Sequence, residues 1–147
     1  MFRSFMPQAL EEARAAGSRG EVPVGAVVTR GADVLARAGN RTRELADPTA
    51  HAEMLAIRAA CAALGQERLA GCAIWVTLEP CAMCAQAIAH ARLARLHFGA
   101  GDLKSGGVLH GARVFAHRQT HHVPEVQDGL AAEESAALLR DFFLSRR

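Results

Sequence analysis

The chain has 147 residues, of which 50% are hydrophobic and 22% are charged. This composition suits one folded domain over residues 1–147 and excludes an intrinsically disordered chain. The 17 basic and 15 acidic residues leave a formal charge of +2, so any contact with nucleic acid must rest on a local patch. The sequence shows neither an apolar run of membrane-spanning length nor a signal-peptide core, and we therefore expect a cytoplasmic protein.

Helices and strands are expected to alternate along the chain. Helical spacing of apolar residues, short apolar runs and the positions of glycine and proline predict, in chain order, a helix over residues 7–17, strands over 22–29 and 34–38, a helix over 50–64, a strand over 72–77, a helix over 80–91, strands over 93–98 and near 122–126, and a helix over 132–143. Thr49 is expected to cap the second helix and Gly65 to close it. This alternation predicts an α/β protein with a sheet covered on both faces, and the hairpin of the first two strands makes the sheet mixed.

Two short clusters carry candidate chemistry, and the first contains cysteines. Cys81 and Cys84 lie three residues apart, so both thiols face one side of the first turn of their predicted helix. A helix N-terminus favours the thiolate, which is the form that binds zinc. A redox pair is the alternative, but the surrounding pattern of a thioredoxin is incomplete. The other two cysteines, Cys61 and Cys72, lie far along their own elements and are expected to be small buried hydrophobes.

The second cluster is His51-Ala52-Glu53. A catalytic zinc site uses three protein ligands and leaves one position open, a requirement that His51, Cys81 and Cys84 would meet. Glu53 can move protons near such a metal only if His51 lies at the very start of its helix, because helical residues two apart otherwise point to opposite sides. The alternative for a histidine or glutamate at a helix start is an ordinary solvated residue.

The sequence resembles a known enzyme family over nearly its whole length. His51-x-Glu53 followed by Pro80-Cys81-x-x-Cys84 is the known signature of the zinc-dependent deaminases. Further similarity lies in Glu21–Ala26, Asn40–Arg41, Asp47–Ala50, Val76–Glu79, Phe98–Ala100, Asp102, Lys104 and Leu138–Phe143. Together these segments resemble the bacterial tRNA-specific adenosine deaminases, in the cytidine/deoxycytidylate deaminase superfamily. The chain departs from the family pattern at Gln86 and over residues 106–110.

The resemblance implies the cytidine-deaminase-like fold, a three-layer α/β/α sandwich with a mixed five-stranded sheet. It implies hydrolytic deamination of adenosine to inosine at the wobble position of a tRNA anticodon, with one zinc ion per subunit activating the water. The implied partner is the anticodon stem-loop, with an arginine tRNA of anticodon ACG as the expected substrate. Members of the family are homodimers whose RNA site includes residues of both subunits, and no membrane partner is implied.

The resemblance also implies roles for single residues. The implied zinc ligands are His51, Cys81 and Cys84. Glu53 would carry protons between the water, the adenine ring and the leaving amine. The side chain of Asn40 and the backbone of Ala52 would hydrogen-bond the flipped base. The walls of the base pocket would come from Val22, Pro23 and Leu78.

Residues 103–122 contain no acid and are the best candidate for an RNA-facing patch. The basic and imidazole side chains in this patch are Lys104, Arg113, Arg118, His110, His117, His121 and His122. The alternative is a solvated loop with neutral histidines. Asp102 next to the patch, and Phe143 and Arg146 on the last helix, are further candidates for RNA contact. An exposed Phe143 could stack on a base, whereas packing in the core is the alternative.

Two other functions stay open at this point. A deaminase of a free base or nucleoside, of the guanine or cytosine type, would share the zinc site. Short bacterial cytidine deaminases carry cysteine where His51 stands, and the Asp102-x-Lys104 segment looks less like a guanine deaminase. A non-catalytic, zinc-stabilised RNA-binding module is disfavoured by Glu53, because a structural zinc site needs no proton carrier.

Overall fold

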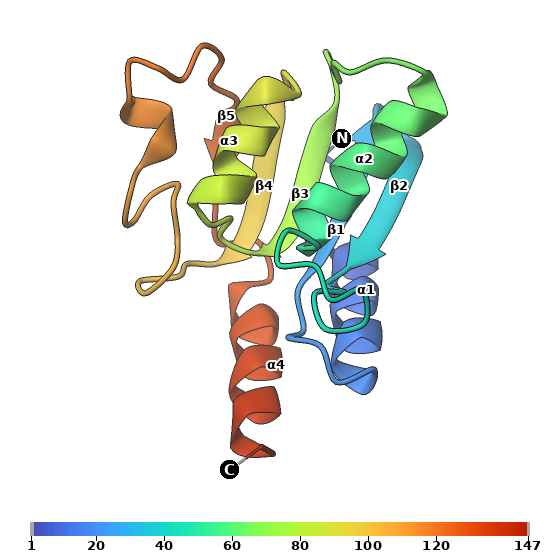
Figure 1. Ribbon diagram of the computed structural model, residues 1–147, viewed down its shortest axis with the longest axis vertical. Helices are drawn as coiled ribbons and strands as arrows, with labels where there is room; N and C mark the ends of the chain where they lie inside the picture. The colour runs from blue at the N-terminus through green and yellow to red at the C-terminus, as the bar shows by residue number, and fades with distance from the viewer. Residues whose placement is uncertain (1, 147) are drawn as a thin grey trace.

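The computed structural model describes residues 2–146 and has one sheet between two layers of helices (Figure 1). The strands are β1 (Gly25–Arg30), β2 (Asp33–Gly39), β3 (Ala73–Leu78), β4 (Arg95–Ala100) and β5 (Glu125–Gln127). The helices are α1 (Met6–Ser18), α2 (Ala52–Leu64), α3 (Ala82–His90) and α4 (Ala132–Leu144), with a 3-10 turn η1 (Val114–Ala116). Within residues 2–146, the helices are too short or too polar to cross a membrane.

The strands form one mixed sheet in the order β2-β1-β3-β4-β5. β1 pairs antiparallel with both β2 and β3, whereas β3, β4 and β5 run parallel. α2 and α3 cover one face of the sheet, and α1 and α4 lie on the other side (Figure 1). The predicted three-layer α/β/α sandwich with a mixed five-stranded sheet is confirmed.

The central strands are buried because helices lie on both sides of them. β1, β3 and β4 are therefore buried along nearly their whole length rather than at alternate residues. Gly25 allows α1 to approach β1 closely, since a Cβ there would collide with the carbonyl oxygen of Ala9. Trp75, on β3, is 4% exposed, stacks on His97 with 3.8 Å between ring centroids, and donates its N–H to the hydroxyl of Thr29.

The start of α2 differs from the sequence prediction. The prediction that Thr49 is the N-cap is wrong, because His51 occupies that position and the helix begins at Ala52. Both the N–H and the hydroxyl of Thr49 donate to Oδ1 of Asp47, so its side chain is engaged in the preceding turn. The predicted end is confirmed, since Gly65 adopts the left-handed conformation with φ of 65° that glycine permits.

The first and last predicted strands are shorter than expected. The strand predicted from residue 22 begins only at Gly25, because the N–H of Val24 bonds back to the carbonyl of Val22 in a tight turn. The strand predicted near residues 122–126 is instead β5, which starts after Pro124. Proline has no N–H to donate to a strand ladder, which explains the later start.

Candidate active site

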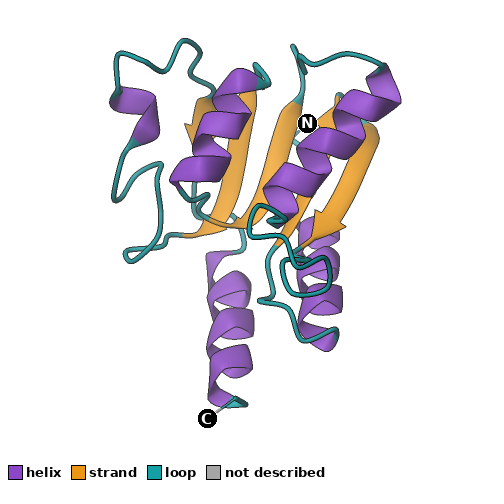
Figure 2. Ribbon diagram, viewed as in Figure 1, coloured by secondary structure: helices purple, strands orange, loops and turns teal. Residues whose placement is uncertain are grey.

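The first turns of α2 and α3 lie at the same end of the sheet. The loops that precede the two helices meet there, on the face that α2 and α3 cover (Figure 2). His51 is the N-cap of α2 and Cys81 is the N-cap of α3, both with extended backbone. α3 thus starts at Ala82, two residues later than predicted. The side chains of these two N-cap residues, which are 30 residues apart in the sequence, therefore meet at one point.

His51, Cys81 and Cys84 form a group that could hold a metal ion, with ligand atoms within 4.8 Å of one another. The Nδ1 of His51 lies 3.7 Å from Sγ of Cys81 and 3.5 Å from Sγ of Cys84. Tetrahedral zinc, with Zn–S of about 2.3 Å and Zn–N of about 2.0 Å, would separate a nitrogen and a sulfur ligand by about 3.5 Å. The three side chains thus have the spacing and the donor atoms of a zinc site with one position left for another ligand.

The two thiols of this group hold their protons very differently. The pKa of Cys81 is lowered to about 4, mainly by a hydrogen bond from the Cys84 thiol and also by a hydrogen bond to His51. Burial has the opposite effect and raises this pKa, but it is outweighed. That same bond to Cys81, together with burial, raises the pKa of Cys84, and the bond between His51 and Cys81 raises the pKa of His51. Cys81 is thus poised as a thiolate, the form that binds soft metals. Of the other cysteines, Cys72 is buried as expected, whereas Cys61 packs against the core but is only partly buried.

Glu53 lies in the first turn of α2 and is 4% exposed. Burial raises the pKa of its carboxyl to about 7, although the hydrogen bond from its own backbone N–H opposes the rise. Because His51 is the N-cap and not a residue within the helix, both side chains belong to the same helix end. A buried carboxyl beside an open metal position can take a proton from water and deliver it to a nearby atom.

Comparisons with known proteins identify the family. The family model described as MafB19-like deaminase matches residues 2–147. The tRNA-specific adenosine deaminase of Agrobacterium fabrum is 58% identical over 97% of this chain and 94% of its own length. This chain belongs to the tRNA-specific adenosine deaminase family.

Solved structures place this member of the family among related deaminases. A structure from studies of A-to-I editing by tRNA:A34 deaminases at the wobble position of transfer RNA matches with a TM-score of 0.91 and 58% identity, over 92% of this chain and 98% of that one. A guanine deaminase from Nitrosomonas europaea matches with a TM-score of 0.80 and 25% identity, over 93% of this chain and 81% of its own. Both structures share the fold of this chain. The sequence identity of this chain to the tRNA deaminase is more than twice its identity to the guanine deaminase.

The base-contact residues that the family pattern implies lie next to the start of α2. Oδ1 of Asn40 accepts the N–H of Ala52 at 2.8 Å, and Nδ2 of Asn40 donates to the carbonyl of Val22 at 3.0 Å. These bonds determine the orientation of the amide, since one partner is a donor and the other an acceptor. A carboxamide has two N–H donors, so one N–H of Asn40 is available to a ligand, whereas the N–H of Ala52 is already bonded to Asn40.

The three expected wall residues separate into two locations. Val22 and Leu78 are partly buried and pack against the main core. Pro23 is buried and lines a hollow of about 370 Å³ beside α1 and α4, together with Phe142. Val22 therefore adjoins Asn40, whereas Pro23 also faces the side of the molecule on which α4 lies.

The candidate RNA residues of this family member lie on two segments. Lys104, Arg113 and Arg118 are exposed on the chain between β4 and β5, and Phe143 and Arg146 are exposed on and just after α4. Phe143 is 52% exposed, so it is not packed in the core. These side chains can be reached by a large ligand, which their proposed role requires.

Several other polar groups of residues 102–122 bond to the protein itself. Oδ1 of Asp102 accepts the backbone N–H groups of residues 104 and 105. His110 contacts the carboxylate of Glu79, His117 contacts the carbonyl of residue 112, and His122 contacts the carbonyl of residue 93. These side chains hold the segment in its shape. Its ability to bind phosphate therefore depends mainly on Arg113, Arg118 and Lys104.

Sequence reasoning missed two buried carboxylates that hold the loops around the site. Glu21 is 2% exposed and accepts the backbone N–H groups of Arg43 and Glu44, in the loop that leads to α2. Glu79 is also 2% exposed and accepts backbone N–H groups from the loop after β4. Burial alone would raise the pKa of each, but these hydrogen bonds outweigh it and hold both pKa values below the usual value. The available signal was an acid directly beside an apolar run at each position.

Proposed function

We propose that this protein hydrolyses adenosine to inosine at the wobble position of a tRNA anticodon. The observation that carries the proposal is a buried Glu53 beside the group His51, Cys81 and Cys84, in a member of the tRNA-specific adenosine deaminase family. We further propose that residues 1–147 act as one deaminase domain.

The proposal includes one zinc ion per chain, held by Nδ1 of His51 and the Sγ atoms of Cys81 and Cys84. The observed N–S distances of 3.7 and 3.5 Å and the nitrogen–sulfur donor set support zinc over magnesium or calcium, which prefer oxygen ligands. A zinc ion bound there would act as a Lewis acid and would lower the pKa of a bound water toward neutral pH.

Glu53 is proposed as the residue that moves protons. Its carboxylate would accept a proton from the attacking water and deliver it to N1 of adenine as C6 is attacked. It would then take the second proton from the new C6 hydroxyl and pass it to the amine, which leaves as ammonia as the C6–N bond breaks and C6=O forms. The overall reaction adds one water and releases one ammonia. The buried position of Glu53 keeps its carboxylate away from bulk water, so its protons pass to the substrate rather than to solvent.

The remaining base contacts are proposed from the local geometry. The second N–H of Asn40 would donate to the flipped adenine, while its other two bonds hold the amide in place. Val22 and Leu78 would contact the apolar faces of the base. Anticodon bases are single-stranded, so moving one out of its stack costs less than in a duplex.

The expected substrate is an arginine tRNA of anticodon ACG, recognised through its anticodon stem-loop, and the expected working form is a homodimer. The exposed Lys104, Arg113, Arg118, Phe143 and Arg146 support an RNA ligand, because they offer positive charge and an aromatic ring to a large partner. Asp102 beside Lys104 would contact RNA through Oδ2, because both of its turn-forming hydrogen bonds use Oδ1.

The test is inosine formation in a transcribed ACG arginine tRNA, with ammonia release from free guanine and cytosine measured in parallel. Glu53→Gln is the inactive variant, and Glu133→Gln, an exposed residue of α4, is the matched control. Inosine from wild type and Glu133→Gln, but not from Glu53→Gln, is the expected result. Ammonia from a free base without inosine would replace the proposal by a free-base deaminase. No reaction from zinc-loaded protein would favour a non-catalytic RNA-binding module.

A further inference from the structure

The loop that follows β4 is organised around one buried carboxylate. The side chain of Glu79 is 0% exposed, and loop 101–111 wraps around it without forming a helix or strand. The backbone donors to this carboxylate, at 3.0, 3.1, 2.9 and 3.0 Å, are the N–H groups of Asp102, Val108, Leu109 and His110. Nδ1 of the His110 ring adds a contact of 2.6 Å to Oε1 of Glu79.

Such a carboxylate and its loop stabilise each other. A buried carboxylate is unfavourable unless several donors satisfy it, and the four backbone donors converge only when the loop folds back on itself. Two glycines allow this approach. A Cβ at Gly106 would lie 2.6 Å from the carboxyl carbon of Glu79, and a Cβ at Gly107 would lie 2.5 Å from the backbone nitrogen of Ala82. The sequence of the loop thus accommodates the carboxylate and the start of α3.

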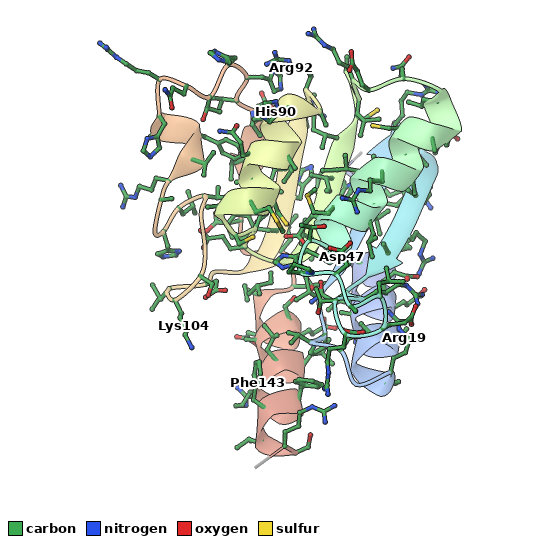
Figure 3. The ribbon with its side chains drawn as sticks, viewed as in Figure 1. Arg19, Asp47, His90, Arg92, Lys104 and Phe143 are labelled. Atoms are coloured by element: carbon green, nitrogen blue, oxygen red, sulfur yellow. The ribbon has the colours of Figure 1, made fainter. Side chains whose placement is uncertain are left out.

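The loop is also attached to the segment that carries a candidate metal ligand. The N–H of Gly107 donates to the carbonyl of Pro80 at 2.8 Å, and Pro80 directly precedes Cys81. At the outer side of the loop, Lys104 is exposed and its side chain points away from the sheet (Figure 3). Glu79 therefore connects the loop that carries the exposed Lys104 to the edge of the proposed active site.

We propose that Glu79 and His110 are positioning residues that hold loop 101–111 in the shape that binds the RNA strand next to the target adenosine. The inference rests on the proposed tRNA function. Glu79 is fully covered and so acts on RNA only through the loop. Its loss should therefore weaken RNA binding and raise KM, while zinc content and kcat at saturating RNA stay near wild type.

The test uses two variants and two matched controls. Glu79→Gln keeps the size of the side chain but places an NH₂ group against backbone N–H donors. His110→Asn removes only the ring contact of a side chain that is 35% exposed, so it should fold even if Glu79→Gln does not. The controls are Glu125→Gln, an exposed acid on β5, and His90→Asn, an exposed histidine at the far end of α3.

Four readouts are needed, and three of them do not depend on turnover. Binding of an anticodon stem-loop RNA is measured in the inactive Glu53→Gln background, and amide hydrogen exchange reports the N–H groups of residues 108–110. Zinc content and the separate values of kcat and KM complete the set. We expect about tenfold weaker RNA binding and a similar rise in KM for Glu79→Gln, about threefold for His110→Asn, and faster exchange at residues 108–110 in Glu79→Gln.

Two results would overturn the inference. RNA binding equal to wild type in both variants would show that the loop shape does not matter for RNA. Loss of zinc, or a fall in kcat with unchanged KM, would assign Glu79 to the metal site instead. If Glu79→Gln does not fold, His110→Asn decides the question alone. Failure of wild type itself to bind or deaminate the stem-loop would instead contradict the proposed function.

Discussion

Replacing the buried Glu21 by glutamine tests how the loop before α2 is held. Oε1 of Glu21 accepts the N–H of Arg43 at 3.1 Å and is 3.5 Å from the Thr42 hydroxyl, while Oε2 accepts the N–H of Glu44 at 2.9 Å. Glutamine keeps the shape but has one oxygen instead of two, so one backbone N–H would face an NH₂ group and lose its acceptor.

The expected loss of stability follows from these bonds. A hydrogen bond to a charged group contributes about 1.5–3 kcal/mol, and the bond that remains would become a neutral one worth about 1 kcal/mol. Glu21→Gln should therefore lower the free energy of unfolding at pH 7 by about 3 kcal/mol. The assay is urea unfolding. The control is Glu44→Gln, whose exposed carboxylate pairs with the surface residues Arg19 and Arg41 and whose loss should change stability by less than about 0.5 kcal/mol.

The loss should depend on pH in a defined direction. Burial alone would raise the pKa of Glu21, but the N–H donors of residues 43 and 44 hold the pKa of the folded protein below the ordinary 4.5. The carboxylate therefore contributes stability above pH 4.5, and this contribution is lost as the pH falls through the folded pKa. The difference between wild type and Glu21→Gln should shrink below pH 4.5. A difference under about 1 kcal/mol at pH 7, or one that is the same at low pH, would refute the reasoning.

Three further predictions concern the site and the core. Glu53→Gln should lower kcat by at least about 100-fold while zinc stays bound, measured by single-turnover inosine formation and metal analysis; retained turnover would exclude Glu53 as the proton carrier. Cys84→Ala should lose zinc and melt at a lower temperature, and added zinc should not restore the wild-type melting temperature. A zinc content equal to wild type would contradict the ligand assignment. Gly25→Ala should destabilise the fold by about 3 kcal/mol, because its Cβ would collide with the backbone of Ala9 in α1; a melting temperature equal to wild type would contradict this close packing.

Local features of the sequence predicted most of the elements because helices and strands depend on neighbouring residues. Periodic apolar residues marked α1 and α4, Pro80 indicated the region where α3 begins, and Gly65 marked the end of α2. The errors arose where a side chain or backbone group bonded elsewhere. Thr49 was expected to cap a helix but bonds to Asp47, and Val22 was expected in a strand but accepts a turn hydrogen bond.

The candidate metal residues were predictable because their chemistry is carried by short spacings. Cys81 and Cys84 share one turn of a helix, and His51 with Glu53 share another. The partners of buried polar groups were not predictable in the same way. The acceptor of the Gly25 N–H is the hydroxyl of Thr77, which is 52 residues away, so nothing within either segment indicates the pair.

The sequence by itself therefore determined the family, the order of helices and strands, and the residue types that can hold zinc and move protons. Only the tertiary structure decided that the N-caps of α2 and α3 meet, that Asn40 bonds to Ala52, and that Glu21 and Glu79 hold the flanking loops. The physical reason is that helix turns involve residues three or four apart, whereas these contacts depend on strand order across the sheet.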